Sequence, residues 1–343
     1  MPELRKDIIT GNWVIVATER AKRPENFSSK KEESGVQARP SYKPDCPFCP
    51  GHEKETPPEV FSYRTPGTPP DTEGWRVRVV PNKFPALSLE GDLQECRHGL
   101  CVAMPAVGVH QVIIETPRHD ASPAELAPGE FAEVLKTYRE RYRTLAEADP
   151  RLEYVLVFRN HGRPAGASLE HPHSQVSAMP FIPPVVEKEL AGAHSYRTGT
   201  GRCVYCDIIK EEVENGERVV AVENGFVVLE PYASRVPFET WVLPEVHSSR
   251  FASQGDMELE QLALVMVRLL DALSRSLGDP AYNYVVHTAP CRGNSADDYY
   301  HWHIEILPKL SIQAGFEIGT GMYINVARPE DTARFLRDAL KSG

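Results

Sequence analysis

The sequence has no run of apolar residues close to the roughly 18 that a membrane-spanning helix requires, so we expect no membrane association. Its opening, MPELRKDIITGNW, lacks a basic segment followed by an apolar one, and we therefore expect no signal peptide and a cytoplasmic location. An excess of positive charge is also missing, because 48 acidic residues outnumber 38 basic ones and the net charge is −10. Nucleic acid is thus not an expected partner, since its binding usually needs a basic face.

Cysteines are few, at seven, and their number is odd. For a cytoplasmic chain we do not expect a disulfide framework. Four of them form two C-x-x-C pairs, CPFC (Cys46, Cys49) and CVYC (Cys203, Cys206), a spacing that lets two thiolates bind one zinc ion. A single pair of this kind can also be a chance or redox pair. The remaining three have no such partner and are expected to be ordinary thiols: Cys96, Cys101 and Cys291.

The chain contains two copies of one plan, and this repeat favours zinc over chance. Each copy has a C-x-x-C pair, then a single histidine, then a His-x-His doublet. The single histidine precedes the doublet by 52 residues in the first copy and by 54 in the second. The histidines are His119, His171 and His173 in the first copy, and His247, His301 and His303 in the second.

The segments between these markers also repeat. Strand-like segments rich in β-branched and aromatic residues are 110–117, 153–160 and 171–179 in the first copy, and 238–244, 283–289 and 301–307 in the second. Helical patterns are 122–148, with Ser122 as N-cap, and 256–277. We therefore predict an α+β fold of two domains, 1–190 and 191–343, each an antiparallel sheet with a packed helix, joined by a link near 190–202.

The doublet HPH gives its two histidines different roles. In a strand, His171, His173 and Gln175 face the same side, and Pro172 must lie at an edge or bulge because it cannot donate a ladder hydrogen bond. One imidazole completes a zinc site, and the other, His173, stays free as a nucleophile that forms a phosphoramidate at phosphorus. The expected zinc ligands are Cys46, Cys49, His119 and His171 in the first copy, and Cys203, Cys206, His247 and His301 in the second.

A glycine-rich loop, NHGRPAGASLE, leads directly into the doublet. Its small residues let a phosphate approach backbone N–H groups, although such a loop can also be an ordinary hairpin connection. Gln175 can hydrogen-bond a phosphoryl oxygen. The other histidines of the chain are treated as ordinary, with His110 the least secure because it opens a strand near the proposed site: His52, His98, His110, His161 and His194.

The H-P-H-x-Q segment after a Gly/Ser loop resembles the active-site signature of the galactose-1-phosphate uridylyltransferase family, a branch of the histidine-triad superfamily. The resemblance covers nearly the whole chain: CPFC, PNKFPAL, FRNHGRPAGAS and AGFEIG occur in the family order, and the opening is similar to the family pattern of Trp followed by Arg-x-x-Arg-Pro. It implies two fused histidine-triad-like domains, a homodimer, and ping-pong transfer of a nucleoside monophosphate between a nucleotide sugar and a sugar 1-phosphate.

The resemblance also implies roles for individual residues. His173 is the catalytic nucleophile and His171 a zinc ligand. Phosphoryl oxygens are contacted by Gln175 and Ser168, with Asn160 nearby. The sugar-phosphate side is contacted by Arg20 and Arg23, and the nucleoside is bordered by Asn82, Lys83 and Phe84. Glu317 reaches the first copy's site from the second.

Two features depart from the family pattern. Where uridylyltransferases have a hexose-binding glutamine six residues after the position of Glu317, this chain has Tyr323. Some members build the second metal site without cysteines, and the corresponding set here is Glu189, His287, His301 and His303. The second C-x-x-C and the GTGMYIN tail are similar to the ADP-glucose phosphorylase branch. We expect two zinc ions, with iron as the alternative at the second site.

The expected reaction is transfer of UMP from UDP-glucose to galactose 1-phosphate, and the alternative is transfer of AMP from ADP-glucose to phosphate. The second copy is expected to be structural, since Trp302 replaces Pro172 and Glu305 replaces Gln175, and a carboxylate would repel a phosphate. A dinucleoside polyphosphate hydrolase is disfavoured because Gln175 cannot exchange a proton with water or a leaving group. A zinc-ribbon-like binding module would leave Ser168 and Gln175 without a purpose.

Overall fold

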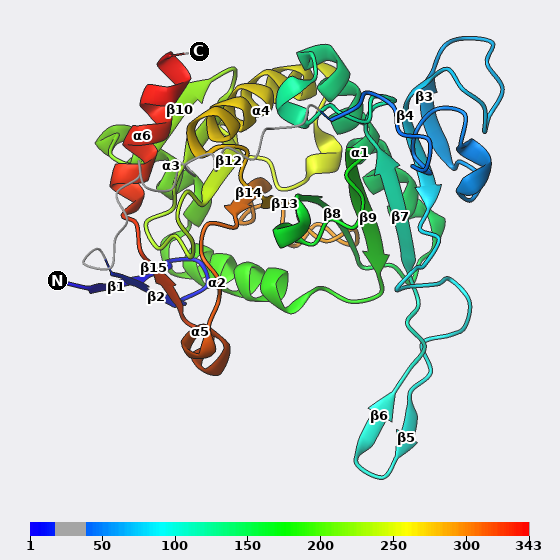
Figure 1. Ribbon diagram of the computed structural model, residues 1–343. Coiled ribbons are helices and arrows are strands. Elements are labelled where there is room, and N and C mark those ends of the chain that lie inside the picture. Colours follow the sequence, from blue (N-terminus) through cyan, green and yellow to red (C-terminus); the bar gives the residue numbers. More distant parts are fainter. Residues whose placement is uncertain (18–38, 343) are drawn as a thin grey trace.

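A ten-stranded β-sheet runs through both halves of the chain in the computed structural model, which describes residues 1–17 and 39–342 (Figure 1). The first half contributes β8 (Tyr154–His161), β9 (His173–Met179), β7 (Val109–Ile114), β4 (Trp75–Pro81) and β3 (Phe61–Arg64), in that order from the centre. The second half contributes β13 (Tyr282–His287), β14 (His303–Pro308), β12 (Thr240–Pro244), β11 (Phe226–Leu229) and β10 (Val219–Glu223).

The two halves meet at the centre of this sheet, where β8 pairs antiparallel with β13. From this junction outward, each half repeats the same order of strands, so the repeat seen in the sequence is a repeat of structure. The mixed α+β class with antiparallel pairing is as predicted. The expected separate sheets are instead one continuous sheet, because the edge strands β8 and β13 satisfy each other's backbone hydrogen bonds.

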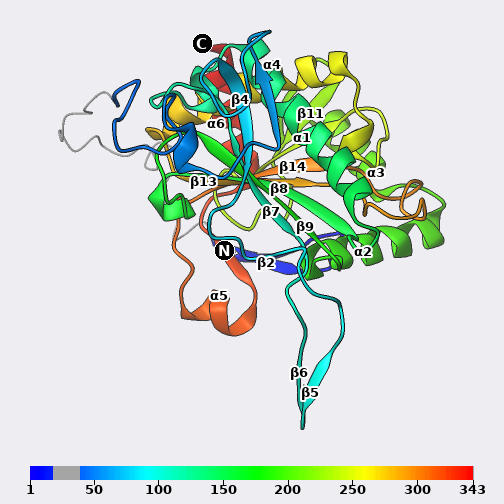
Figure 2. The ribbon, with the colours of Figure 1, turned by 90° about the vertical axis from the view of Figure 1, so that its right-hand side faces the viewer.

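One face of the sheet is covered by α1 (Pro128–Ala148), α4 (Asp256–Leu277) and α6 (Pro329–Lys341), and the main apolar core lies between them (Figure 2). The first predicted helix begins later than expected. Ser122 starts a 3-10 turn, η4 (Pro123–Glu125), where its N–H is 2.7 Å from Glu125 Oε2, and α1 then begins at Pro128. The cap residue was correctly identified, but it caps a turn that precedes the long helix.

On the opposite face, α2 (Pro184–Thr200) and α3 (Val204–Asn215) pack against smaller apolar clusters. The predicted link near 190–202 is largely helical, because most of it belongs to α2, which is capped by Gly201 with φ +74°. A Cβ atom at Gly192 would lie 1.7 Å from the Ile9 carbonyl oxygen, so glycine lets the N-terminal segment pass directly against this helix.

Smaller elements surround the sheet. A three-stranded sheet joins β1 (Glu3–Lys6), β2 (Trp13–Val16) and β15 (Tyr323–Asn325), beside the short helix α5 (Gly315–Thr320). The hairpin of β5 (Cys96–His98) and β6 (Cys101–Ala103) projects away from the body of the molecule in both views (Figures 1 and 2). The described residues also contain the 3-10 turns η3 (Glu53–Glu55), η5 (Arg163–Ala165) and η6 (Phe251–Ser253). Among the helices of residues 1–17 and 39–342, none is long and apolar enough to cross a membrane.

Candidate active site

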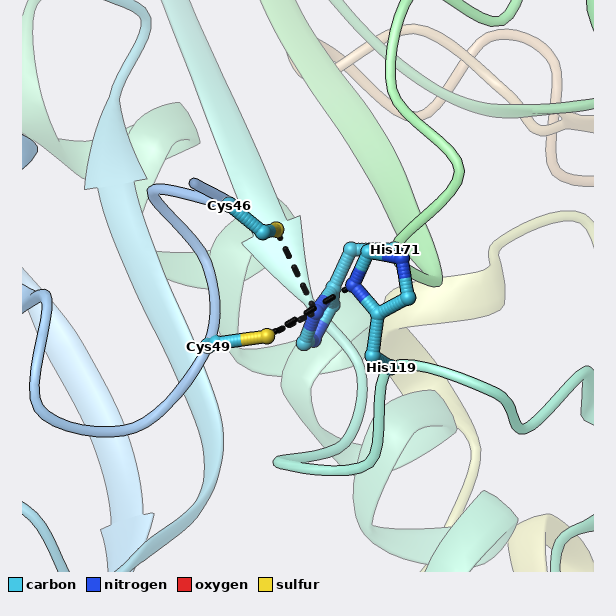
Figure 3. Close-up of side chains that lie close together, drawn as sticks. All are labelled: Cys46, Cys49, His119 and His171. Atoms are coloured by element: carbon cyan, nitrogen blue, oxygen red, sulfur yellow. Dashed lines mark hydrogen bonds between the residues drawn. The ribbon is translucent and has the colours of Figure 1, made fainter. Parts of the chain in front are cut away.

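Four residues predicted to bind zinc in the first half converge at one buried point (Figure 3). The loop before η3 carries Cys46 and Cys49, the turn after β7 carries His119, and His171 lies just before β9. His171 Nδ1 is 3.7 Å from both sulfur atoms, and His119 Nδ1 is 3.5 Å from Cys49 Sγ. Tetrahedral zinc, with Zn–S of about 2.3 Å and Zn–N of about 2.0 Å, places sulfur and nitrogen about 3.5 Å apart, so the set fits this ion.

The protonation states of these groups also fit a metal. The distance from His171 Nε2 to the Thr116 carbonyl oxygen is 2.8 Å, so Nε2 carries the proton and Nδ1 presents its lone pair to the sulfur atoms. Burial lowers the pKa of His171 to about 4 and also lowers the pKa of His119, which keeps both imidazoles neutral near pH 7. Burial raises the pKa of Cys46 to about 11, so a bound cation is what would hold its thiolate form.

His173 is held by the preceding histidine in a defined tautomer. Its Nδ1 is 2.8 Å from the His171 carbonyl oxygen, so Nδ1 donates a hydrogen bond and Nε2 keeps its lone pair. The edge of the Phe48 ring packs against the imidazole, with 5.5 Å between ring centroids. Burial lowers the pKa of His173, which favours the neutral and nucleophilic form. The two histidines thus have separate environments, as expected, although the strand begins at His173 and leaves His171 outside it.

His173 lines a cavity of about 790 Å³. The other predicted residues that line it are Gln175, Ser168, Asn82, Lys83 and Phe84. Gln175 Oε1 lies 2.8 Å from His110 Nε2, and His110 Nδ1 accepts a hydrogen bond from the Ala86 N–H. His110 therefore donates to the Gln175 carbonyl oxygen, which leaves the Gln175 amide NH₂ group for a ligand in the cavity. His110 was treated as ordinary from the sequence, but it contacts a residue of this site. The one sequence feature that indicated this was its position at the start of a strand near the proposed site.

An adjoining hollow of about 370 Å³ lies on the other side of the His171–His173 segment. Asn160 and Ser168 line it together with the glycine-rich loop. The Asn160 side-chain oxygen accepts a hydrogen bond of 2.8 Å from Asn283 Nδ2, which also donates to the Ala165 carbonyl. Asn283 belongs to the second half, so both halves fix the polar groups beside His173. Sequence reasoning missed Asn283, because pairing of β8 with β13 was not predicted.

Three predicted residues are not placed at the cavity of the described chain. Arg20 and Arg23 lie outside the described residues. Glu317 belongs to α5, where its Oε2 atom accepts a 2.9 Å hydrogen bond from the Ala314 N–H, and it lines neither hollow beside His173. The expectation that Glu317 reaches the first half's site within one chain is therefore not met, because α5 lies beside β15.

The second half brings its four predicted ligands together in the same way: Cys203, Cys206, His247 and His301. His247 Nδ1 and His301 Nδ1 are 3.3 Å and 3.8 Å from Cys206 Sγ. His301 Nε2 is 2.9 Å from the Pro244 carbonyl oxygen. This contact corresponds to the one between His171 Nε2 and the Thr116 carbonyl oxygen. Because His301 faces the cysteines, the alternative set without cysteines keeps only Glu189, His287 and His303.

The counterpart of the catalytic cavity in the second half measures about 260 Å³. His303 Nδ1 is 3.1 Å from the His301 carbonyl oxygen, so this histidine is held as His173 is. Glu305 replaces Gln175 and forms a 2.7 Å ion pair with Arg235. Burial opposes its charge, but Arg235 and His287 hold the pKa of Glu305 well below its usual range. Glu189 of α2 also lines this cavity, with its Oε1 atom 3.0 Å from His287 Nδ1.

The chain is similar to known proteins over its whole length. The sequence model of the galactose-1-phosphate uridyl transferase N-terminal domain matches residues 1–183, and that of a domain of unknown function matches residues 108–342. An ADP-glucose phosphorylase of Arabidopsis thaliana is 39% identical over 341 residues, covering 98% of this chain and 93% of the relative. A galactose-1-phosphate uridylyltransferase of Thermotoga maritima is 28% identical, covering 98% of each chain.

Solved structures agree with these sequence relatives. An ADP-glucose phosphorylase from Arabidopsis thaliana with bound ADP-glucose superposes with a TM-score of 0.82 and 36% identity, covering 98% of this chain and 99% of the other. A uridylyltransferase structure superposes with a TM-score of 0.75 and 29% identity, covering 100% and 99%. The sequence match over more than half of the chain and the identity above 30% establish the relationship. The chain belongs to the galactose-1-phosphate uridylyltransferase family of nucleotidyltransferases.

Proposed function

We propose that this enzyme transfers a nucleoside monophosphate from a nucleotide sugar to an acceptor through a covalent adduct on His173. The observation that carries this proposal is the His173 ring, whose Nδ1 is held by the His171 carbonyl while Nε2 lies in the cavity. In the first step, Nε2 attacks the α-phosphorus, a P–N bond forms, and the bond to the sugar 1-phosphate breaks. In the second step, an acceptor oxygen attacks the same phosphorus and the P–N bond breaks.

The cavity offers groups that stabilise this transfer. The Gln175 amide and the Ser168 hydroxyl are placed to donate hydrogen bonds to phosphoryl oxygens as their charge increases. Asn160, fixed by Asn283, lies beside the same phosphate position. Lys83 and Lys54 add positive charge at the cavity wall, which an acidic chain must gather locally to attract a nucleotide sugar.

ADP-glucose as donor and inorganic phosphate as acceptor are the substrates we favour. An ADP-glucose phosphorylase is the 39% identical relative, and a related structure has bound ADP-glucose. Tyr323 also stands where uridylyltransferases have a hexose-binding glutamine. Phosphate attacking the AMP–His173 adduct would release ADP and restore the neutral histidine. The second candidate is UMP transfer from UDP-glucose to galactose 1-phosphate, supported by the named activity of relatives at 28% and 30% identity.

Both cysteine–histidine sets are proposed to hold zinc, with iron as the alternative at the second. A metal ion in the first set would act structurally, by fixing His171 and hence the carbonyl group that orients His173. A homodimer is also proposed. Exposed apolar side chains on the β5–β6 hairpin (Leu100, Val102) and on α5 (Phe316, Ile318) support an interface, and only a partner subunit would bring Glu317 to a catalytic cavity. A cytoplasmic location stays a prediction.

Incubation of the purified enzyme with ADP-glucose or UDP-glucose, each without acceptor, tests the substrate. Intact-mass spectrometry is expected to detect one added AMP per chain with ADP-glucose, and adding inorganic phosphate should remove it with formation of ADP. If UDP-glucose instead adds UMP to the enzyme, and galactose 1-phosphate but not phosphate removes it, the enzyme is a uridylyltransferase. Absence of label with both nucleotide sugars would contradict the covalent mechanism.

A further inference from the structure

A buried ion pair lies behind the catalytic strand, on the sheet face opposite to the cavity. Arg159 of β8 pairs with Glu115, which follows β7, and both side chains are almost fully buried. The Glu115 carboxylate also accepts a 3.1 Å hydrogen bond from the Tyr138 hydroxyl of α1, and Tyr138 contacts the hydroxyl of Tyr284 on β13. Arg159 of β8 and Tyr138 of α1 therefore both hold one carboxylate that has no place in the chemistry described so far.

The backbone around this carboxylate holds the catalytic segment from both sides. The Glu115 N–H donates a 3.1 Å hydrogen bond to the Pro172 carbonyl, between the two histidines. The next residue, Thr116, accepts the 2.8 Å hydrogen bond from His171 Nε2. His171 in turn holds His173 Nδ1 with its own carbonyl group. The orientation of the nucleophile therefore depends on where residues 115 and 116 are anchored.

The second half has the same carbonyl–imidazole contact without an ion pair. Pro244 is the acceptor for His301, and it also takes the position of Glu115, because it lies three residues after Trp241, which pairs with Glu305 as Val112 pairs with Gln175. Val286 takes the place of Arg159, because it pairs with Ile304 after His303, as Arg159 pairs with Ser174 after His173. Both positions are uncharged in the second half, so an ion pair is not needed to build this part of the fold. A buried ion pair costs desolvation energy and is weak evidence for stability, so its presence in the first half alone calls for another role.

We propose that Arg159 and Glu115 form a positioning pair for His173. The guanidinium group fixes the Glu115 carboxylate, and through it the two backbone groups that hold Pro172 and His171. Arg159 also lines the hollow beside His171 and His173, and we assign the effect of the pair to its hold on residues 115 and 116, and through them on His171. The expected effect on the rate of His173 nucleotidylation rests on the proposed function. The expected effect on the position of His171 does not depend on that reaction.

The decisive variant replaces the ion pair with apolar residues, Glu115→Leu with Arg159→Val, and the valine is the residue of the second half at this position. Because it removes both charges, no unpaired ion stays buried, and we expect a melting temperature close to that of the wild type. The rate of His173 nucleotidylation at saturating nucleotide sugar should fall about 10- to 100-fold, with half-saturation unchanged. The matched control, Glu212→Leu with Arg218→Met, removes an ion pair of the second half and should leave this rate unchanged. A folded variant with the wild-type rate overturns the proposal.

Two further measurements keep the outcome decisive. If the double variant does not fold, Arg159→Lys retains the charge but loses the fork geometry, and it should label His173 several-fold more slowly with unchanged half-saturation. A wild-type rate in Arg159→Lys would then overturn the positioning role. If the wild type takes no label from either nucleotide sugar, the proposed function fails, and zinc release to a chelator decides the inference. The double variant should release zinc from the first set about 10- to 100-fold faster and from the second set at the wild-type rate; equal release from the first set overturns it.

Discussion

The two halves of this enzyme present the same histidine in opposite surroundings. His173 and His303 each begin a strand, and each Nδ1 is held by the carbonyl of a metal-set histidine two residues earlier. The first lies at a cavity of about 790 Å³, whereas the second lies at one of about 260 Å³. A correctly oriented imidazole is therefore common to both halves, and the difference in function must come from what surrounds it.

The surroundings differ in volume and in charge. Val112 lies beside Gln175 in the first half, whereas Trp241 takes that place beside Glu305 in the second and fills much of the space. His287 of the second half takes the place of Asn160. Burial opposes a positive charge on His287, but Glu189 and Glu305 raise the pKa of His287 to about 9. The second half thus holds a buried network of fixed charges where the first half leaves neutral hydrogen-bond donors for a phosphate. Openness and neutral donors, rather than the histidine itself, therefore distinguish the first half, in which we propose that the reaction takes place.

Removal of the nucleophile should have the largest effect on this comparison. His173→Ala is expected to lower the rate of nucleotidyl transfer about a thousandfold or more, because His173 is the imidazole among the described residues that line the cavity. Rapid-quench measurement of label from ADP-glucose checks this. His98→Ala, on the projecting hairpin, is the matched control and should label normally. Substantial turnover in His173→Ala would show that the halves have been assigned the wrong roles.

A carboxylate introduced into the first half should reproduce the inactivity of the second. Gln175→Glu places a negative charge where phosphoryl oxygens carry theirs and removes an amide donor, so transfer should slow about 100- to 1000-fold. The reciprocal Glu305→Gln leaves Arg235 without one of its partners, and it should lower the melting temperature without changing the rate. Steady-state rates and thermal unfolding of both variants test this. Equal rates in Gln175→Glu and the wild type would refute the charge argument.

Loss of a metal ligand should distinguish the halves by rate rather than by stability. Cys49→Ser and Cys206→Ser should each lose about one equivalent of metal and unfold at a lower temperature, because structural zinc stabilises the folded chain. Only Cys49→Ser should also slow transfer about 10- to 100-fold, since His171 orients His173. Elemental analysis and single-turnover rates give both quantities. Equal rates in the two variants would argue against this link between metal and nucleophile.

The smallest effect is expected at His110, which holds the Gln175 side chain. His110→Phe keeps a ring of similar size but removes the hydrogen bond, worth about 1 kcal/mol, so transfer should slow roughly fivefold. The double variant with Gln175→Ala should be no slower than Gln175→Ala alone, because the histidine acts only through the glutamine. Additive losses in this double-mutant cycle would mean that His110 contacts the substrate independently.

Local signals in the sequence were sufficient for the central part of the fold. Segments rich in β-branched and aromatic residues located three strands of each half, and helical spacing located α4 at residues 256–277. The outer strands β3, β4, β10 and β11 and the helices α2, α3 and α6 were not predicted. The C-x-x-C and His-x-His spacings brought the correct four residues together in each half, because these side chains share short loops next to strand ends. What could not be predicted is non-local: the pairing of β8 with β13 depends on two edge strands far apart in the sequence.

The same limit applied to the site. Asn283 and Glu189 act on residues more than 90 positions away, and no spacing pattern indicates such contacts. The segment near 190–202 was predicted as a link without a helix, yet α2 packs Val186 and Ala193 into apolar clusters of the folded chain. Motifs therefore identified the reacting groups, and packing determined which groups support them.

The most direct test of the difference between the halves is to locate the nucleotidyl group on the labelled enzyme. After a brief reaction with ADP-glucose in the absence of phosphate, peptide mapping under neutral conditions that preserve P–N bonds should find AMP on His173 alone. The peptide that contains His303 should be unmodified. AMP on His303, or a labelled enzyme whose His173 peptide is unmodified, would contradict the account.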